Sequence, residues 1–472
     1  MISFLPICGS IRKNTGFHTM IFNRPLTADE RKDSVRNLYI FNIINGGSYV
    51  CVGELIMILL AVDIGCPDVI VAALGTMLYL GFLMLPLGRI VAARIGAAKC
   101  DALFWCIRNF CALLFATSAI WAYHGHMTAA FVMVLLFSFG FYGCRAAGAV
   151  LQQPLTGEIA LPEERAKIIG VGGGLFWASA TAGLLCIIAA LFLRKDAHGA
   201  FPSLLVSIIC IGSILGIISS VFLARIHETD VLRESSRRPI MPDLRRLFRL
   251  DPFRRLLVST IALNLASMLL VPTMLLVLKR GYGLSNLEAS LWSVAQWGAA
   301  IVGAFVTAWA GRRYGPRREM IVSYQALLFL CAIWIFLTWW GNTSATVTLG
   351  ILWIICLFMG GLTRMVMESA VTHYYLTVTD PDLRISGSLV LYTAMGAAAG
   401  IIGITISSVL MLWIGRNGAT ATPGPTALLA YRNYFIVLFA LLTAAMPLVL
   451  RLVPLPEADR HIVPPHETRK LR

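Results

Sequence analysis

The segment RIHETDVLRESSRRPIMPDLRRLFRLDPFRR, from Arg225 to Arg255, is the longest polar run in the sequence and lies near its middle. Nine of its residues are arginine. The chain on either side is predominantly apolar, with long hydrophobic runs separated by short polar stretches. A basic linker between two hydrophobic halves is typical of a membrane protein whose two helical bundles are joined on the cytoplasmic side.

The overall composition supports this interpretation. The 472 residues are 58% hydrophobic and only 13% charged, with a mean hydropathy of +0.77. Soluble domains carry about 25% charged residues, so this chain has too little charge to cover a water-facing surface. The net charge of +15 would also suit a nucleic-acid-binding protein. The distribution of the positive charge must decide between the two classes.

The apolar runs define the expected architecture. A helix needs about 20 apolar residues to cross the hydrocarbon core, and we expect six such spans before the linker and six after it. We therefore predict an all-α membrane protein of twelve transmembrane helices, arranged as two six-helix bundles (38–224 and 256–453) with a leader (1–37) and a tail (454–472). The expected spans are 38–62, 67–87, 101–122, 127–151, 168–193, 202–224, 256–278, 287–310, 319–340, 346–370, 386–414 and 433–450.

Lysine and arginine indicate the orientation. With the N-terminus inside, 30 of the 39 basic residues fall in cytoplasmic segments and 6 in external loops. This asymmetry predicts a multi-pass protein of the cytoplasmic membrane with both termini in the cytoplasm. It also explains the positive charge without nucleic acid. Residues 1–19 look irregular, and Met20 is an alternative start.

Enzymatic and metal-dependent functions find no support in the motifs. The eleven cysteines show no CxxC spacing and lie mostly inside apolar runs, so we expect neither a disulfide framework nor a metal site. No Walker, HExxH or GxSxG motif occurs in a plausible context. We expect no enzyme activity and no cofactor. We expect a monomer in the lipid bilayer that binds a small molecule, with protons as an optional coupling ion.

The two halves share a register at an offset of 219 residues. The coincidences are more frequent than random placement of arginine would give, and they fall at equivalent places in the predicted topology. They indicate an internal duplication that produces parallel repeats. The matching pairs are Arg36 with Arg255, Asn45 with Asn264, Arg94 with Arg313, Gly96 with Gly315, Arg145 with Arg364, Pro162 with Pro381, and Arg165 with Arg384.

Two loops carry a resemblance to a known family. The loops RIVAARIGAAK (Arg89–Lys99) and AWAGRRYGPRR (Ala308–Arg318) resemble the GxxxDRxGRR loop of the major facilitator superfamily. Both depart from it, because Arg89 and Ala308 replace the leading glycine, and Ala93 and Arg312 replace the acid. The resemblance implies alternating access between two halves around a central site. It also implies that the loops form a cytoplasmic gate through Arg94, Gly96, Lys99, Arg313, Gly315 and Arg317.

Ionisable residues inside the spans are the first candidates for a site, because charges are costly in a membrane. Arg145 and Arg364 are symmetry mates, and a pair of guanidinium groups in a central cavity would suit a carboxylate or phosphate. The alternative is that they close the inner gate. Glu368 lies four residues after Arg364, where the two side chains can pair on one helical face.

The remaining candidates are acids, amides and aromatic residues. Glu54 is our candidate for proton coupling, and an ion pair with Arg108 is its structural alternative. Asn45 and Asn264 suit either substrate hydroxyls or bonds between helices. Trp292 and Gln296, beside Trp297, suit either stacking on a substrate ring or simple helix packing.

These residues predict a secondary transporter that imports an organic anion or a sugar, with proton coupling as one option. The alternatives are a drug/proton antiporter and a non-transporting receptor or assembly factor. A transporter needs a polar cavity between its halves, whereas a receptor does not.

Overall fold

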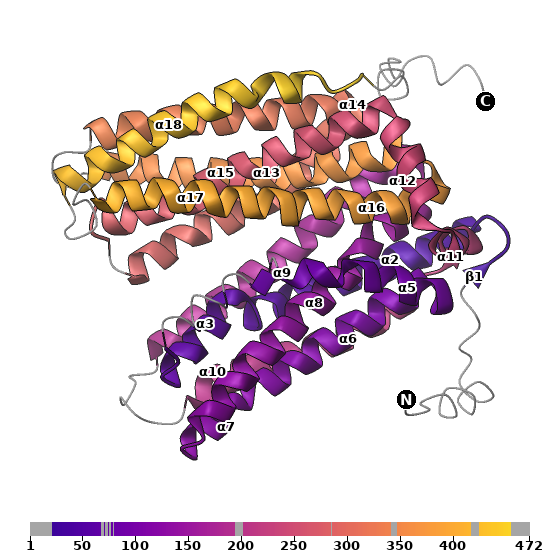
Figure 1. The fold of residues 1–472 in the computed structure, drawn as a ribbon, viewed down its shortest axis with the longest axis horizontal. Helices are drawn as coiled ribbons and strands as arrows, with labels where there is room; N and C mark the ends of the chain where they lie inside the picture. Colours follow the sequence, from indigo (N-terminus) through magenta and orange to yellow (C-terminus); the bar gives the residue numbers. More distant parts are fainter. Residues whose placement is uncertain are drawn as a thin grey trace.

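The computed structural model describes residues 21–67, 80–193, 202–284, 286–340, 347–416 and 424–454, together with four positions between 70 and 78. Long helices of the first half lie beside those of the second half (Figure 1). Within these described residues, ten stretches are long and apolar enough to cross a membrane. Many large apolar side chains point outward, among them Phe305, Phe329 and Leu412, each more than 60% exposed. An outer surface of this kind is suited to lipid.

The first half follows the predicted spans with one prominent break. The first span consists of two helices, because the chain interrupts the helix at Val52 and Gly53. Much of the first part of the second expected span, 67–87, lies outside the described residues. The elements of this half are α2 (Ala28–Cys51), α3 (Glu54–Asp63), η2 (Phe82–Met84), α5 (Leu85–Ile95), α6 (Ala97–Ala116), α7 (Ser118–Tyr123), α8 (Met127–Ile159), η3 (Pro162–Glu164), α9 (Arg165–Leu193) and α10 (Ser203–Ala224).

The second half differs from the predicted spans at three places. The spans 287–310 and 319–340 are joined in one element that breaks at Gly315, the span 386–414 contains a π-helical turn, and the last helix begins at Pro425 instead of 433. The elements of this half are α13 (Asp251–Arg280), α14 (Asn286–Trp340), α15 (Val347–Val378), η4 (Pro381–Leu383), α16 (Arg384–Tyr392), η5 (Thr393–Ala398), α17 (Ala399–Arg416) and α18 (Pro425–Leu450).

The local geometry repeats at the offset of 219 residues. Gly96 and Gly315 adopt nearly the same backbone conformation, with φ/ψ of 91°/164° and 77°/160°. A positive φ is accessible to glycine at little cost, which explains the pairing of these two positions. The short turns η3 and η4 also begin 219 residues apart, at Pro162 and Pro381. The register read from the sequence therefore corresponds to equivalent backbone turns.

One close contact between helices occurs in both halves, but the glycine that permits it lies on a different helix of the pair in each half. A Cβ added to Gly143 would lie 2.1 Å from the sulfur of Met84, and one added to Gly303 would lie 2.9 Å from the carbonyl oxygen of Leu362. Met84 corresponds to Gly303, and Gly143 to Leu362, at the same offset. Each half thus keeps one glycine at this crossing, but on opposite helices.

The basic linker is folded rather than extended. It forms α11 (Asp230–Arg237) and α12 (Ile240–Arg249), and before them β2 (Glu228–Thr229) pairs in parallel with β1 (Ile21–Phe22). The linker helices lie at one end of the molecule, which we call the linker side (Figure 1). The helices of the two halves run close together on this side and diverge toward the opposite end.

Candidate functional site

A cavity of about 440 Å³ lies between the halves. Its wall comes from α2, α6, α8 and α9 of the first half and from α15 and α16 of the second. Among the described residues, the charged groups that line it are three arginines and one glutamate, an excess of two positive charges: Arg108, Arg145, Arg364 and Glu368. The wall is otherwise amide, hydroxyl, aromatic and apolar.

Arg108 is the most deeply buried of these groups. Its side chain is 1% exposed, and its guanidinium carbon lies 5.0 Å from the ring centre of Trp105 and 4.6 Å from that of Phe141. Its one hydrogen bond to a described residue is a long contact of 3.5 Å from Nη1 to Oδ1 of Asn45. Nε and Nη2 are buried without a partner among the described residues. Such donors are costly to leave unpaired.

Arg145 faces the same space from α8. Its guanidinium carbon lies 5.6 Å from the ring centre of Tyr49 on α2. No ion pair between described residues includes Arg145 or Arg108. Two cations on neighbouring helices, held by aromatic faces rather than carboxylates, leave the cavity electropositive.

Arg364 differs because its charge is compensated within its own helix. Nε donates to Oε1 of Glu368 at 2.9 Å, the pairing that the spacing of four residues predicts. Both side chains are more than a third exposed and line the cavity. They form an exposed pair that can exchange partners at little cost.

The cavity is closed on the linker side by contacts between the halves. Nε2 of Gln153 on α8 donates to Oγ1 of Thr372 on α15 at 3.1 Å. These two residues are 219 positions apart, so equivalent residues of the two repeats meet at the floor of the cavity. Nη1 of Arg165 also donates to the carbonyl oxygen of Leu376 at 3.0 Å.

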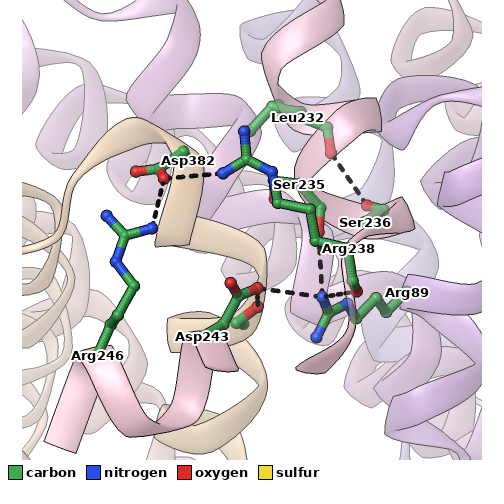
Figure 2. Close-up of polar contacts among 9 residues, drawn as sticks. Arg89, Leu232, Ser235, Ser236, Arg238, Asp243, Arg246 and Asp382 are labelled. Atoms are coloured by element: carbon green, nitrogen blue, oxygen red, sulfur yellow. Dashed lines mark hydrogen bonds and ion pairs between the residues drawn. The ribbon is translucent and has the colours of Figure 1, made fainter. Parts of the chain in front are cut away.

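Below this floor, Arg89 joins the first half to the linker (Figure 2). Its Nη2 donates to Oδ2 of Asp243 at 3.2 Å and to the carbonyl oxygens of Ser235 and Arg238 at 3.0 and 2.8 Å. Oγ of Ser386 on α16 donates to the same carboxylate oxygen at 2.7 Å. The first half, the linker and the second half therefore meet at Asp243.

A second, exposed cluster lies beside this junction. Oδ2 of Asp382 accepts from Nη1 of Arg238 and from Nη1 of Arg246, each at 3.0 Å (Figure 2). Burial distinguishes the two clusters. The side chains of Arg89 and Asp243 are 6% and 4% exposed, whereas those of Arg238 and Arg246 are 47% and 51% exposed. Burial also lowers the pKa of Arg89, and Asp243 opposes that effect.

The structure brings five predicted site residues to the cavity: Asn45, Arg108, Arg145, Arg364 and Glu368. Asn45 also makes a bond between helices, since its Oδ1 accepts from Nε1 of Trp105 at 3.0 Å. Its symmetry mate Asn264 instead bonds to the carbonyl oxygen of Thr260 in its own helix, away from the cavity.

Gln296 is not a cavity residue either. It lies at a tight crossing of α14 and α15, where a Cβ on Gly361 would be 2.0 Å from its carbonyl oxygen. Its neighbour Trp297 packs on Trp177 of α9, with ring centres 5.4 Å apart. The side chains of Glu54 and Trp292 lie outside the described residues.

The predicted gate residues lie on the linker side. The carbonyl oxygen of Arg94 accepts from Nη2 of Arg233 at 3.3 Å, and Gly96 ends α5 beside Lys99 in the first turn of α6. Arg313 lies over the rings of Trp309 and Tyr314, Gly315 breaks α14, and Nε of Arg317 donates to the carbonyl oxygen of Leu452 at 2.7 Å.

Sequence reasoning missed several polar residues near the site. Arg89 was visible only as a departure from the loop pattern, and its partner Asp243 is 154 residues away. Glu228 of the linker accepts from the backbone N–H groups of Ala97 and Ala98 at the start of α6, at 2.8 and 3.3 Å. Burial raises the pKa of Glu228 to about 7, although these two bonds oppose the shift.

Similar solved structures come from several transporters. The proton:xylose symporter XylE is 11% identical, with a TM-score of 0.67 over 92% of this chain and 100% of that chain. A bacterial homologue of the iron transporter ferroportin is 13% identical, with a TM-score of 0.64 over 89% and 99%. The human organic anion transporter MFSD10 is 16% identical, with a TM-score of 0.56 over 87% and 99%. At these identities the likeness concerns the fold alone.

A search of curated proteins gives no significant match. The family of MFS/sugar transport proteins matches residues 160–457, more than half of the chain. The match agrees with the many apolar helices, the repeated turns and the cavity between the halves. This chain therefore belongs to the major facilitator superfamily of multi-pass membrane transporters.

Proposed function

We propose that this protein is a secondary transporter that carries a small organic anion through the cavity between its halves. The observation that supports this most strongly is Arg108, which is buried beside the cavity with two guanidinium nitrogens that have no partner among the described residues. Arg145 adds a second cation that forms no ion pair with a described carboxylate. A carboxylate or phosphate would provide the acceptors that the described residues lack.

Transport would follow alternating access between two six-helix bundles, 38–224 and 256–453, with twelve spans in total. The linker side would face the cytoplasm, because the basic residues concentrate there. In the present conformation, Gln153 and Thr372 close that side of the cavity. Opening would separate these mates and the Asp243 junction, while the opposite ends of the helices approach one another. The cytoplasmic membrane is the proposed location.

A neutral sugar is the second candidate substrate. The cavity wall contains several aromatic side chains on which a sugar ring can stack, among them Trp105, Tyr142, Phe176 and Trp177. The family match also names sugar transport. The excess of two positive charges favours an anion over a neutral sugar. The charged side chains in the cavity likewise favour transport over a purely structural role.

Thermal unfolding of the purified protein with succinate, glucuronate, glucose 6-phosphate and glucose tests this function. We expect an anion to raise the melting temperature of the wild type and to do so less in Arg108→Ala and Arg145→Ala. Arg313→Ala is the matched control, since Arg313 lies outside the cavity. Stabilisation by glucose alone, unchanged in both cavity variants, would favour the neutral sugar and contradict the anion site.

A further inference from the structure

Asp101 is a buried acid that the mechanism above does not use. It lies in the second turn of α6 from the linker side and is 0% exposed. Neither Oδ1 nor Oδ2 has a hydrogen-bond partner among the described residues. The expected third span begins at this residue, so hydropathy does not distinguish it from a polar residue at a helix end.

Asp101 lies next to the proposed anion site. It shares one face of α6 with Trp105 and Arg108, which line the cavity, because the three residues are spaced by four and then three positions. On α8, a Cβ added to Gly148 would be 2.8 Å from both Oδ1 of Asp101 and the Trp105 ring. Gly148 in turn follows Arg145 by three residues. The carboxyl group is thus packed beneath the cavity wall, about two helical turns from Arg108 on the same helix.

The groups that face the carboxyl from each packed element do not neutralise a charge on it. The hydroxyl of Tyr392, from α16 of the second half, lies within electrostatic range of Asp101, and also of Arg145 and Glu368. Cys100 is the titratable neighbour on α6 itself. From α8 the contact is the backbone at Gly148. None of the ion pairs between described residues includes Asp101.

An ionised carboxylate without a partner is very costly to bury, so the neutral acid is the form that this environment accepts. We propose that Asp101 is the proton-binding group of the transport cycle and that it couples inward proton flow to anion import. This inference rests on the proposed anion function. In the present conformation, closed on the linker side, Asp101 carries a proton on one carboxyl oxygen.

Coupling follows from the position of the carboxyl between the halves. Opening the linker side moves α16 and its Tyr392 away from α6 and α8, so water reaches Asp101 and takes up its proton. The ionised carboxylate then adds a negative charge beneath the cavity, about two helical turns from Arg108, where the low dielectric carries its field to the anion site. That charge weakens anion binding, and the anion leaves on the same side as the proton. Because each ligand favours binding of the other, the two are carried together.

The matched control is Glu319, a second buried acid whose two carboxylate oxygens have no partner among the described residues. It lies near the equivalent position of the other half, since its mate at the offset of 219 is Cys100. It does not line the cavity, and it packs near Gly311 on α14. Glu319→Gln therefore removes a buried acid without altering the anion site.

Infrared spectroscopy of the purified protein tests protonation without any substrate. At neutral pH, we expect the wild type to show protonated carboxyl absorption with one component that is lost in Asp101→Asn and kept in Glu319→Gln, which loses a different component. Asparagine resembles the neutral acid in shape, so Asp101→Asn should unfold at a temperature no lower than the wild type. Asp101→Ser is the second variant should the first fail to fold. A carboxyl band unchanged in both Asp101 variants would overturn the proposal.

Anion affinity as a function of pH tests the coupling. With glucose 6-phosphate and succinate as probes, affinity should fall as the pH rises in the wild type and in Glu319→Gln. It should be independent of pH in Asp101→Asn. Retention of the wild-type pH dependence in Asp101→Asn, or its loss only in Glu54→Gln, would overturn the coupling role. If neither probe binds the wild type at any pH, the anion function fails, whereas the infrared band still reports on Asp101.

Discussion

Arg108 in the cavity and Arg89 at the linker junction are both buried arginines of the first half, 1% and 5% exposed. Arg89 faces a carboxylate and two backbone carbonyls, and its partner Asp243 is held in turn by Ser386. Arg108 faces aromatic rings and one amide oxygen at 3.5 Å. The difference teaches that burial alone does not define a role. A buried cation with its acceptors in the protein holds segments together, whereas one without them is available to a ligand.

The largest effect is expected at the junction. Asp243→Ala removes the carboxylate and leaves Arg89 buried against two carbonyl oxygens alone. Loss of one partner of a buried ion pair costs about 3–5 kcal/mol, and we expect a loss near 3 kcal/mol in denaturant unfolding of the micelle-embedded protein. The double variant Arg89→Met/Asp243→Leu should recover most of it. Equal losses in the single and double variants would contradict a role for the unpaired charge.

Substitution of Arg108 in the cavity should change anion affinity rather than the stability of the protein. Arg108→Met removes a cation that no described carboxylate pairs, so the stability of the unliganded protein should stay the same or rise. Anion affinity should fall about 30-fold, as loss of a charge-assisted bond worth about 2 kcal/mol predicts. Isothermal titration with the anion that stabilises the wild type measures the affinity of the wild type and of Arg108→Met. Thermal unfolding without ligand measures their stability. A large loss of stability without ligand would show that Arg108 serves the fold.

Glu228 extends the comparison of buried charged groups to an acid of the linker. Burial raises the pKa of its carboxyl group to about 7. In the unfolded chain, the carboxyl group of Glu228 has a pKa near 4.3. At pH values between these two pKa values, the folded protein therefore binds more protons than the unfolded chain. Stability should therefore fall as the pH rises, by about 2 kcal/mol between about pH 5 and pH 7. Melting temperatures across this range should show a steeper slope in the wild type than in Glu228→Gln.

The smallest effect is expected at Asp382, beside the buried junction. Its two arginine partners are about half exposed, and exposed pairs contribute about 0–1 kcal/mol each. Asp382→Ala should thus destabilise the protein by about 1 kcal/mol or less, and added salt should shrink the difference. The same denaturant titration that follows Asp243→Ala measures it. A loss as large as that of Asp243→Ala would mean that exposure does not separate the two clusters.

Much of the arrangement is already present in local sequence patterns. Apolar runs predict the helices, because a lipid environment selects for them along the whole length of a span. The spacing of four residues predicts the pair Arg364–Glu368. The offset of 219 predicts the equivalent turns at Gly96 and Gly315, because a backbone position with a positive φ favours glycine in both halves. Each of these signals depends on residues near one another or on one repeated conformation.

The tertiary structure decided what those patterns leave open. Asn45 and Asn264 are equivalent in sequence, yet only Asn45 faces the cavity, because its neighbour on α6 supplies an indole donor. Hydropathy marked Asp101 as a helix end, but packing against Gly148 buries it completely. Arg89 finds its carboxylate 154 residues later in the chain. Hydropathy reports how apolar a segment is, whereas side-chain direction and contacts between distant helices arise only when the helices pack.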